Sequence, residues 1–278
     1  MHYRVYLSSV GECSDPILLA ELAHEAEEEG WDGVFVWDHI GGPLQVADPW
    51  VALAAMAMRT QHVKLGPIVT PVARRRPWKL ARETVTLDHL SNGRLVLGVG
   101  LGWGPEEFDS FGEDGNPRVR AEKLDEGLDV MGGLWSGEPF SHSGKHFQVK
   151  DACFLPRPVQ SPRIPIWPCG AWTDKRAPFR RAARWDGVIA IADPGENRAI
   201  LPDEVRAIRA CIKQHRTNDD PFDVTVILWS DGDRSTEEQE ETARYAESGV
   251  TWWLEDLSTE RFPLEEARKR LLKGPPAH

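Results

Sequence analysis

Two ionisable residues, Asp38 and His39, stand side by side at the end of an apolar, strand-like segment, residues 33–39. Histidine titrates near neutral pH, so it can take up or release a proton during catalysis. We therefore predict that His39 is a catalytic residue or contacts a cofactor; an imidazole hydrogen-bonded beneath a loop is the alternative. Asp38 is predicted to orient His39 or to cap the turn Gly41-Gly42-Pro43.

Glycines recur in the segment GVGLGWG, which begins at Gly98. The spacing does not match a dinucleotide-binding fingerprint, because Trp103 and Pro105 stand where a further glycine is required. Glycine has no side chain, so we interpret Gly98, Gly100 and Gly102 as positions where a flat, wide ligand can approach the backbone closely. Close packing at a crowded sheet edge is the alternative explanation.

The segment CGAWTD links another apolar run to a helix that is expected to begin near Asp174. Because free backbone N–H groups at a helix start attract phosphate, this turn is a candidate phosphate site. Basic side chains follow it and either add to such a site or form a solvated helix face. They are Lys175, Arg176, Arg180 and Arg181.

Three consecutive arginines, Arg74 to Arg76, follow the strand-like segment 64–70. They are predicted either to meet an acidic ligand tail or to pair with nearby carboxylates of the chain. The carboxylates in question are those of Glu106, Glu107 and Asp109.

Other kinds of chemistry lack the residues they need. The sequence has no HxH or HExxH pair and no cluster of carboxylates and histidines at metal-ligand spacing, so no metal site is predicted. It has no GxSxG motif, and no lysine ends a strand-like segment, so neither a serine nucleophile nor a Schiff base is indicated. The cysteines are scattered without a CxxC pair, which indicates reduced thiols. They are Cys13, Cys153, Cys169 and Cys211.

Composition restricts the partners and the location that we expect. The chain of 278 residues carries a net charge of −11, whereas nucleic-acid and anionic-membrane binding need a basic surface, so neither partner is predicted. Mean hydropathy is −0.43, and no apolar run is long enough to span a bilayer. The start of the chain, MHYRVYLSSVGECSD, lacks the pattern of a signal peptide, so we expect a cytoplasmic protein.

Strand-length apolar runs alternate with helix-period segments along the whole chain. The runs are not internally alternating, which is typical of parallel strands buried on both faces. We predict eight strands, at residues 3–9, 33–39, 64–70, 95–100, 164–170, 187–191, 222–229 and 251–255. Eight such units in this length predict an α/β fold, a (β/α)8 TIM barrel forming one domain over residues 1–278. A doubly wound open sheet with a small second domain is the alternative.

Cap residues mark several helix ends. Asp15 followed by Pro16 begins the first helix, and Gly30 ends it. A later helix is expected to begin at Ser235, since Ser235 and Glu238 have the spacing of a capping box.

Two segments are longer than the simple repeat requires. Residues 102–117 follow the fourth strand, and residues 137–162, before the fifth, have the pattern of a hairpin and a Pro-rich connection. We predict both as insertions that cover the mouth of the barrel.

Several segments together resemble the luciferase-like monooxygenase superfamily of flavin- and F420-dependent (β/α)8 oxidoreductases. The resemblance covers residues 1 to about 190 and is most specific in LARE and LSNGRLVLGVG. The matching segments are GWDGVFVWDH (30–39), LGPIVTP (65–71), RRPWKLARETVTLDHLSNGRLVLGVGLGW (75–103), EFDSFG (107–112), LWSGEPF (134–140), PRPVQSPRIPIWPCG (156–170) and AARWDG (182–187).

The resemblance implies FMN or coenzyme F420 as cofactor and assigns roles to individual residues. His39 matches the histidine that handles the proton accompanying hydride transfer in the F420 branch. A non-prolyl cis peptide is implied behind the central ring of the cofactor, near Pro67, Ile68 and Val69. The remaining implied cofactor contacts are Gly98, Gly100 and Gly102 around the ring and Gly170 and Ala171 at the phosphate, with their neighbours Cys169 and Trp172.

One departure from the family concerns a carboxylate. Sugar-phosphate dehydrogenases of the F420 branch carry a proton-donating Glu where this chain has Trp103, so sugar-phosphate activity is doubtful here. The carboxylate of Glu106 or Glu107 could approach the site in place of that Glu. Candidate walls of a pocket for an aromatic or apolar substrate are Trp103, Phe108, Trp172 and Trp229.

Three functions remain open at this point. The first is an oxidoreductase acting on a small organic substrate, either with reduced FMN and O2 or by hydride exchange with F420. A separate flavin or F420 reductase would supply the reduced cofactor. The second is a flavin- or deazaflavin-binding protein without turnover. The third is a cofactor-free barrel lyase or isomerase, for which the strand ends offer few carboxylates and no lysine. A homo-oligomer is expected.

Overall fold

The computed structural model describes residues 1–41, 45–196 and 198–276, in which parallel strands alternate with helices. The barrel strands are β1 (His2–Leu7), β2 (Gly33–Val36), β3 (Lys64–Pro67), β4 (Thr70–Pro71), β5 (Leu97–Gly100), β8 (Ile166–Ala171), β9 (Gly187–Ile191), β10 (Asp223–Leu228) and β11 (Trp252–Asp256). The helices are α1 (Pro16–Glu28), α2 (Pro49–Arg59), α3 (Pro77–Leu90), α4 (Glu106–Asp109), α5 (Pro117–Trp135), α6 (Ala177–Ala182), α7 (Pro202–Lys213), α8 (Thr236–Ser248) and α9 (Leu264–Leu271).

The sheet closes on itself. Its order is β3-β2-β1-β11-β10-β9-β8-β5-β4, with parallel pairs throughout. The two ends meet where the amide of Leu65 donates to Arg94 O (3.0 Å) and the amide of Val96 donates to Leu65 O (2.9 Å). The predicted barrel is therefore confirmed, and the open doubly wound alternative is wrong.

β3 and β4 are two pieces of one barrel strand. The break between them contains a cis peptide bond joining Ile68 to Val69. The non-prolyl cis peptide that was expected near these residues is thus confirmed, and it lies in the strand next to β2.

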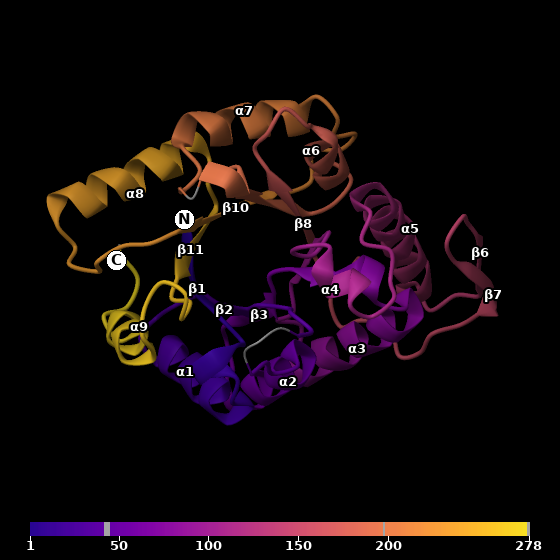
Figure 1. Cartoon of the computed structure of the whole chain (residues 1–278), viewed down its shortest axis with the longest axis horizontal. Helices are drawn as coiled ribbons and strands as arrows, with labels where there is room; N and C mark the ends of the chain where they lie inside the picture. The colour runs from indigo at the N-terminus through magenta and orange to yellow at the C-terminus, as the bar shows by residue number, and fades with distance from the viewer. Residues whose placement is uncertain (42–44, 197, 277–278) are drawn as a thin grey trace.

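The helices surround the strands as a ring (Figure 1). Asp15 caps α1 by accepting the amide of Ile17 at 2.8 Å, and Ser235 caps α8 by accepting the amide of Glu238 at 3.3 Å, as predicted. The Glu238 carboxylate accepts amides that lie further upstream than a capping box requires. None of the described helices is long and apolar enough to cross a membrane.

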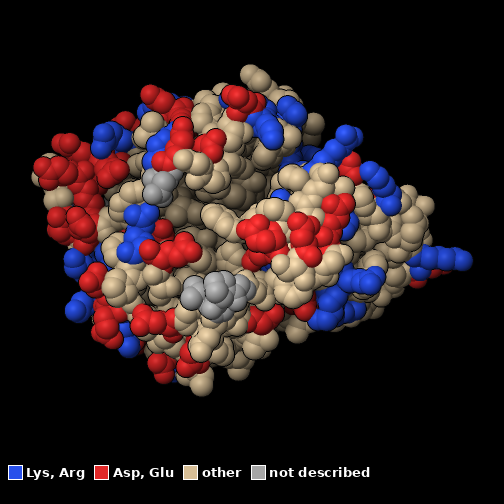
Figure 2. Space-filling model, in the orientation of Figure 1, with Lys and Arg blue, Asp and Glu red and all other residues tan. Residues whose placement is uncertain are grey.

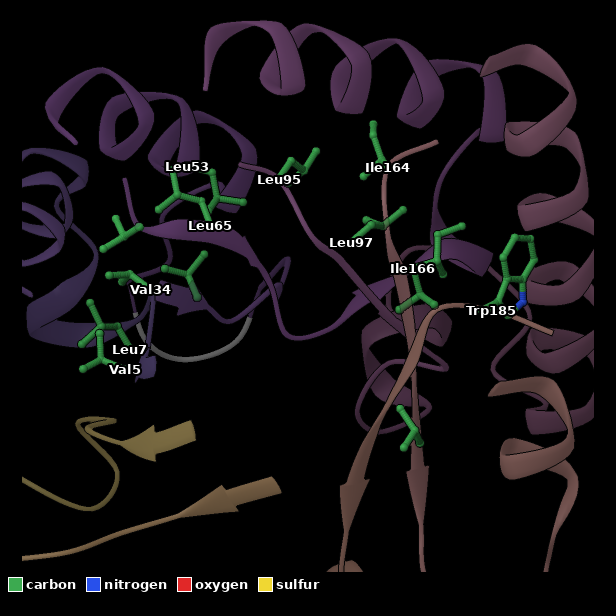
Figure 3. Close-up of a cluster of buried hydrophobic side chains, with 14 of the residues drawn as sticks. Val5, Leu7, Val34, Leu53, Leu65, Leu95, Leu97, Ile164, Ile166 and Trp185 are labelled. Atoms are coloured by element: carbon green, nitrogen blue, oxygen red, sulfur yellow. The ribbon is translucent and has the colours of Figure 1, made fainter. Parts of the chain in front are cut away.

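Apolar side chains form two layers because successive strand residues point to opposite faces. Outward-facing residues such as Val5, Leu65 and Ile166 pack against the helices (Figure 3). Inward-facing residues fill the interior of the barrel. They are Phe35, Ile68, Val96, Trp167, Ile189, Trp252 and Leu254.

The two insertions lie in different places. Residues 102–104 of the first line the mouth of the barrel, together with the start of α5. The second contains the expected hairpin, β6 (Phe140–Ser143) and β7 (Gln148–Ala152), but it projects beyond α5 at the right of Figure 1. Its apolar side chains pack on the helices, with Phe147 edge-on to Trp78 at 6.3 Å, so the prediction that it covers the mouth is wrong.

Candidate active site

A cavity of about 820 Å³ opens at the carboxyl ends of the barrel strands. Figure 2 shows the hollow at the centre of this face, with acidic side chains gathered over α4 at its edge. This volume is typical of a site for a small molecule or cofactor. In parallel barrels, this end of the strands is also where catalytic residues lie.

A buried ion-pair network stands behind one wall of the cavity. The carboxylate of Asp38, which follows β2, accepts bonds from Arg75 (2.9 Å to each oxygen) and from Arg74 (3.1 Å). The hydroxyl of Thr70 donates to the same carboxylate at 2.7 Å. Asp38 therefore holds the arginines after β4 and does not orient His39 through its side chain; residues 42 and 43 of the turn that it was expected to cap lie outside the described residues.

A second carboxylate orients His39. Nδ1 of His39 lies 2.8 Å from Oε1 of Glu107, and Nη1 of Arg74 donates to Oε2 at 2.9 Å. A carboxylate only accepts hydrogen bonds, so Nδ1 of His39 carries the proton. The other ring nitrogen, Nε2, has no partner within the described part of the chain, and the His39 side chain, 25% exposed, borders the cavity.

Glu107 is ionised in this setting. Burial by itself raises the pKa of its carboxyl, but the hydrogen bond from His39 and the charge of Arg74 outweigh burial and lower that pKa below its usual value. An ionised carboxylate against Nδ1 stabilises the positive charge that His39 acquires when Nε2 takes up a proton. The arrangement is suited to general acid–base catalysis.

The arginine triplet follows the second alternative only in part, since Arg74 alone pairs with one of the carboxylates that the sequence offered, Glu107. Arg74 pairs with Glu107 and with Asp38, and its side chain is only 3% exposed. Arg75 pairs with Asp38. Arg76 stacks near Trp78, with its guanidinium 5.8 Å from the ring.

Most of the predicted site residues meet at the cavity. Those that line it are Asp38, His39, Ile68, Val69, Gly100, Gly102, Trp103, Cys169, Gly170 and Ala171. The predicted residues Pro67, Gly98, Phe108, Trp172 and Trp229 are not among the lining residues.

Three aromatic side chains are engaged elsewhere, which corrects their expected positions. Phe108, 1% exposed, lies beneath the rim against Gly102, and Arg120 stacks on its ring at 4.8 Å. Trp172 packs against Arg176 at 3.8 Å, and Trp229 packs against a guanidinium at 3.8 Å. Trp103 does border the cavity, with 72% of its surface exposed.

The glycines make room for atoms of the protein itself, and two of them, Gly100 and Gly102, also line the cavity, whereas Gly98 does not. A Cβ on Gly98 would lie 2.3 Å from Pro67 O, and a Cβ on Gly100 would lie 2.5 Å from Val69 Cγ2. These glycines make room for the bent strand β3–β4. Gly102, whose φ is +85°, is required by its backbone conformation as well.

The expected phosphate turn also differs from its prediction. Cys169 to Ala171 belong to β8, the amide of Trp172 donates to Ile191 O at 2.8 Å, and α6 begins only at Ala177. The helix α6 begins later than expected because the Thr173 hydroxyl accepts a hydrogen bond from the amide of Lys175 at 3.1 Å and forms a turn. The free amides of a helix start are therefore absent at Cys169–Trp172.

Basic side chains nevertheless line the cavity near α5 and α6. They are Arg118, Lys175 and Arg181. Arg181 is bound to Asp125 and Arg118 to Glu122, whereas Lys175 makes no ion pair within the described part of the chain. This side of the cavity is suited to an anionic group.

Sequence reasoning missed several lining residues. Tyr6 borders the cavity from β1, and its hydroxyl donates to Ile68 O at 3.3 Å. Burial, together with nearby acidic groups, raises the pKa of Tyr6 well above its usual value. Ile191 and Ile227 enter from β9 and β10. Strand alternation was the available signal, since each of these residues shares the inward face with core residues of the same strand.

Comparisons with known proteins agree on the type of protein. The sequence model described as luciferase-like monooxygenase matches residues 11–270. The chain is 36% identical over 159 residues to an F420-dependent glucose-6-phosphate dehydrogenase of Microbacterium testaceum, a match covering 55% of this chain and 46% of that protein.

Two solved structures share the fold across the whole chain. An F420-dependent secondary alcohol dehydrogenase in complex with an F420-acetone adduct superposes with a TM-score of 0.79 at 18% identity, covering 99% of this chain and 98% of that chain. The monooxygenase RslO1 from Streptomyces bottropensis gives a TM-score of 0.70 at 22% identity, covering 98% and 96%. At these identities the likeness establishes the fold alone.

Proposed function

Because the chain belongs to the luciferase-like monooxygenase family, we propose that it is an F420-dependent oxidoreductase that exchanges a hydride between the deazaflavin and a small organic substrate. The pairing of His39 with Glu107 carries this proposal. Oxidation of an alcohol, or reduction of a carbonyl, moves one proton together with the hydride, and His39 presents its second ring nitrogen, Nε2, at the cavity.

His39 acts as the proton acceptor in the oxidising direction and as the donor in the reverse direction. Glu107 acts as a positioning residue, because it fixes the tautomer through Nδ1 and stabilises the imidazolium. Arg74 keeps Glu107 ionised and in place.

The cavity fits the cofactor in size and in polarity. Apolar side chains of Ile68, Val69 and Ile191 suit the face of a planar ring. Lys175 and Arg118, at the side near α5 and α6, suit the polyanionic tail of F420. When bound there, the deazaflavin supplies the hydride acceptor or donor. The protein excludes water and positions the substrate against His39.

Reduced FMN with O2 is the second candidate. One observation favours it: Arg74 and Arg75, which the sequence offered as contacts for the polyanionic tail of F420, are both paired with Asp38. An FMN enzyme would need only one phosphate contact and would depend on a separate flavin reductase.

Titration of the purified protein with F420, FMN and reduced FMN, followed by quenching of tryptophan fluorescence, separates these candidates. We expect micromolar binding of F420 and much weaker binding of both flavins. Selective binding of reduced FMN would replace the first candidate with the second, and absence of binding to any of the three would contradict both.

A further inference from the structure

We propose that the groove between the β6–β7 hairpin and the helices α3 and α5 is a binding site for a small aromatic carboxylate. The groove is separate from the cavity at the mouth of the barrel, with which it shares no lining residue. The proposal therefore goes beyond the proposed function and does not depend on it.

The groove contains a cavity of about 240 Å³. Trp78 of α3, Leu134 of α5, four residues of β7 and Phe154, which follows β7, line this cavity. Its volume is small beside that of pockets for drug-sized molecules, so it suits a single ring with one substituent.

The hairpin is fixed on the helices, so the cavity is already formed before a ligand binds. The carboxylate of Glu126 on α5 accepts the amide of Phe147 at 2.6 Å. The ring of Phe147 lies edge-on to Trp78, with 6.3 Å between the ring centres. Phe140 occupies the space over Gly133 of α5, where a Cβ would lie 2.1 Å from the ring. A preformed cavity lowers the entropic cost of binding.

The interior of the cavity is apolar and partly aromatic. Leu134 is fully buried, and Trp78 and Phe154 are partly buried against the core of the protein. None of the described residues that line the cavity carries a carboxylate. An aromatic ring gains from burial against these side chains and from stacking on the two rings.

Lys150 of β7 places a positive charge without an ionic partner at the cavity. It lines the cavity and makes no ion pair within the described part of the chain, whereas Lys145 of the same hairpin pairs with Glu122 at 2.6 Å. The two free carboxylates of the same insertion, on Glu138 and Asp151, are not among the lining residues. A carboxylate on the ligand would supply the missing partner of Lys150.

Arg82 adds a second cation beside the aromatic wall. It follows Trp78 by one helical turn, so the two side chains lie on the same face of α3. Its guanidinium stands 4.2 Å from the centre of the Phe154 ring and donates to Leu155 O at 2.7 Å, but it makes no ion pair among the residues that the structure describes. Basic side chains are prominent at the right of Figure 2, where Figure 1 places the hairpin. Because the chain as a whole carries a net charge of −11, this local excess of cations favours an anionic ligand.

The ring and the carboxylate of the ligand thus have different partners. Trp78 and Phe154 serve the ring, and Lys150 and Arg82 serve the carboxylate. A neutral aromatic molecule would form no ion pair, an aliphatic acid would lose the stacking, and an aromatic amine would meet like charges.

Four probes of similar size test the proposal: benzoate, benzyl alcohol, benzylamine and cyclohexanecarboxylate. Their binding to the full chain is followed by ¹H–¹⁵N NMR of the tryptophan indole groups. The signals of Trp78, at the groove, and of Trp103, at the mouth, are assigned from the Trp78→Phe and Trp103→Phe variants. The measurement needs neither cofactor nor turnover, so its result is independent of the proposed function.

Benzoate should shift the Trp78 signal with a Kd of about 1 mM, and the other three probes should bind at least about fivefold more weakly. Equal or tighter binding of any of these three overturns the proposal. So does a shift of the Trp103 signal alone, or the absence of any shift.

Three lysine variants test where the carboxylate binds. Lys150→Gln removes the cation at the cavity, so the affinity for benzoate should fall about fivefold, whereas Lys150→Arg keeps the charge and should stay within about twofold of wild type. Lys145→Gln removes the same charge from the same hairpin, at a lysine that is already paired with Glu122, and should leave the affinity unchanged. Equal losses in Lys150→Gln and Lys145→Gln, or no loss in Lys150→Gln, would overturn the proposal.

Discussion

The two ends of the barrel each bury an arginine, and they do so in opposite ways. At the mouth, Arg74 is held by the carboxylates of Asp38 and Glu107. At the floor, Arg4 of β1 is 1% exposed and lies on aromatic faces, 3.1 Å from the ring of Trp252 and 4.3 Å from that of Trp167. Its Nε and Nη1 have no hydrogen-bond partner within the described part of the chain.

The difference indicates what each end is built to do. Burial lowers the pKa of Arg4 well below its usual value, with only distant compensation from Asp223 and Asp32. The aromatic faces attract the guanidinium cation through their quadrupoles, but they do not fix the direction of its N–H groups as hydrogen-bond acceptors would. At the mouth, fixed hydrogen bonds set the position and tautomer of His39. Barrels generally place chemistry at the carboxyl ends of the strands and stability at the amino ends.

The strongest test of this contrast is the loss of the imidazole at the mouth. His39→Ala removes the proposed proton acceptor, so turnover should fall by about 10²–10⁴-fold, while affinity for F420 should change by less than about threefold. Steady-state kinetics and fluorescence titration measure the two quantities. His62→Ala, on an exposed residue far from the mouth, is the matched control. Unchanged turnover would reassign His39 to a structural role.

Breaking the ion pairs should be the next largest effect. Arg74→Met keeps the length of the side chain but leaves Glu107 and part of the Asp38 charge unpaired in a buried setting. We expect the free energy of unfolding to fall by about 3–5 kcal/mol, measured by urea denaturation. A loss below about 1 kcal/mol would show that water or local rearrangement compensates for the missing guanidinium.

The pH dependence of stability should reveal Glu107 itself. Its folded-state pKa is lowered, so its contribution is present at neutral pH and is lost as pH falls through that pKa. Glu107→Gln should therefore unfold more easily than wild type at pH 7. The gap between the two proteins should close in acid, below the usual range of glutamate. A gap that stays constant with pH would mean that the lowered pKa contributes nothing to stability.

Much of the barrel could be predicted because its signals are local. Strand-length apolar runs, the caps at Asp15 and Ser235 and the spacing of the helices all act within a few residues. The resemblance added the position of the bend at Ile68, which no local pattern contains. The hairpin was expected correctly as an element, but its location depends on packing against Trp78 and the helices, which only the tertiary structure sets.

The site was harder because its decisive contacts are long-range. Asp38 was assigned to His39 since the two are adjacent, but adjacent residues of an extended segment point to opposite sides. The residue that does contact the His39 ring, Glu107, lies on α4, a helix of four residues that is too short to give a periodic pattern in the sequence. The packing role of Gly98 and Gly100 was missed for a related reason: the atoms that need their space, Pro67 O and the side chain of Val69, come from a neighbouring strand.

The smallest predicted effect returns to the floor and carries the opposite sign. Arg4→Met replaces a poorly solvated cation by an apolar side chain of similar length among Phe35, Trp167 and Trp252. Exchange of a buried charge for a well-packed apolar group is often neutral or stabilising, so we expect a gain of about 1 kcal/mol in the free energy of unfolding. F420 affinity and turnover should be unchanged, since the cavity lies at the other end. A loss comparable to that of Arg74→Met would mean that Arg4 has ionic partners as strong as those at the mouth, and the contrast between the two ends would then fail.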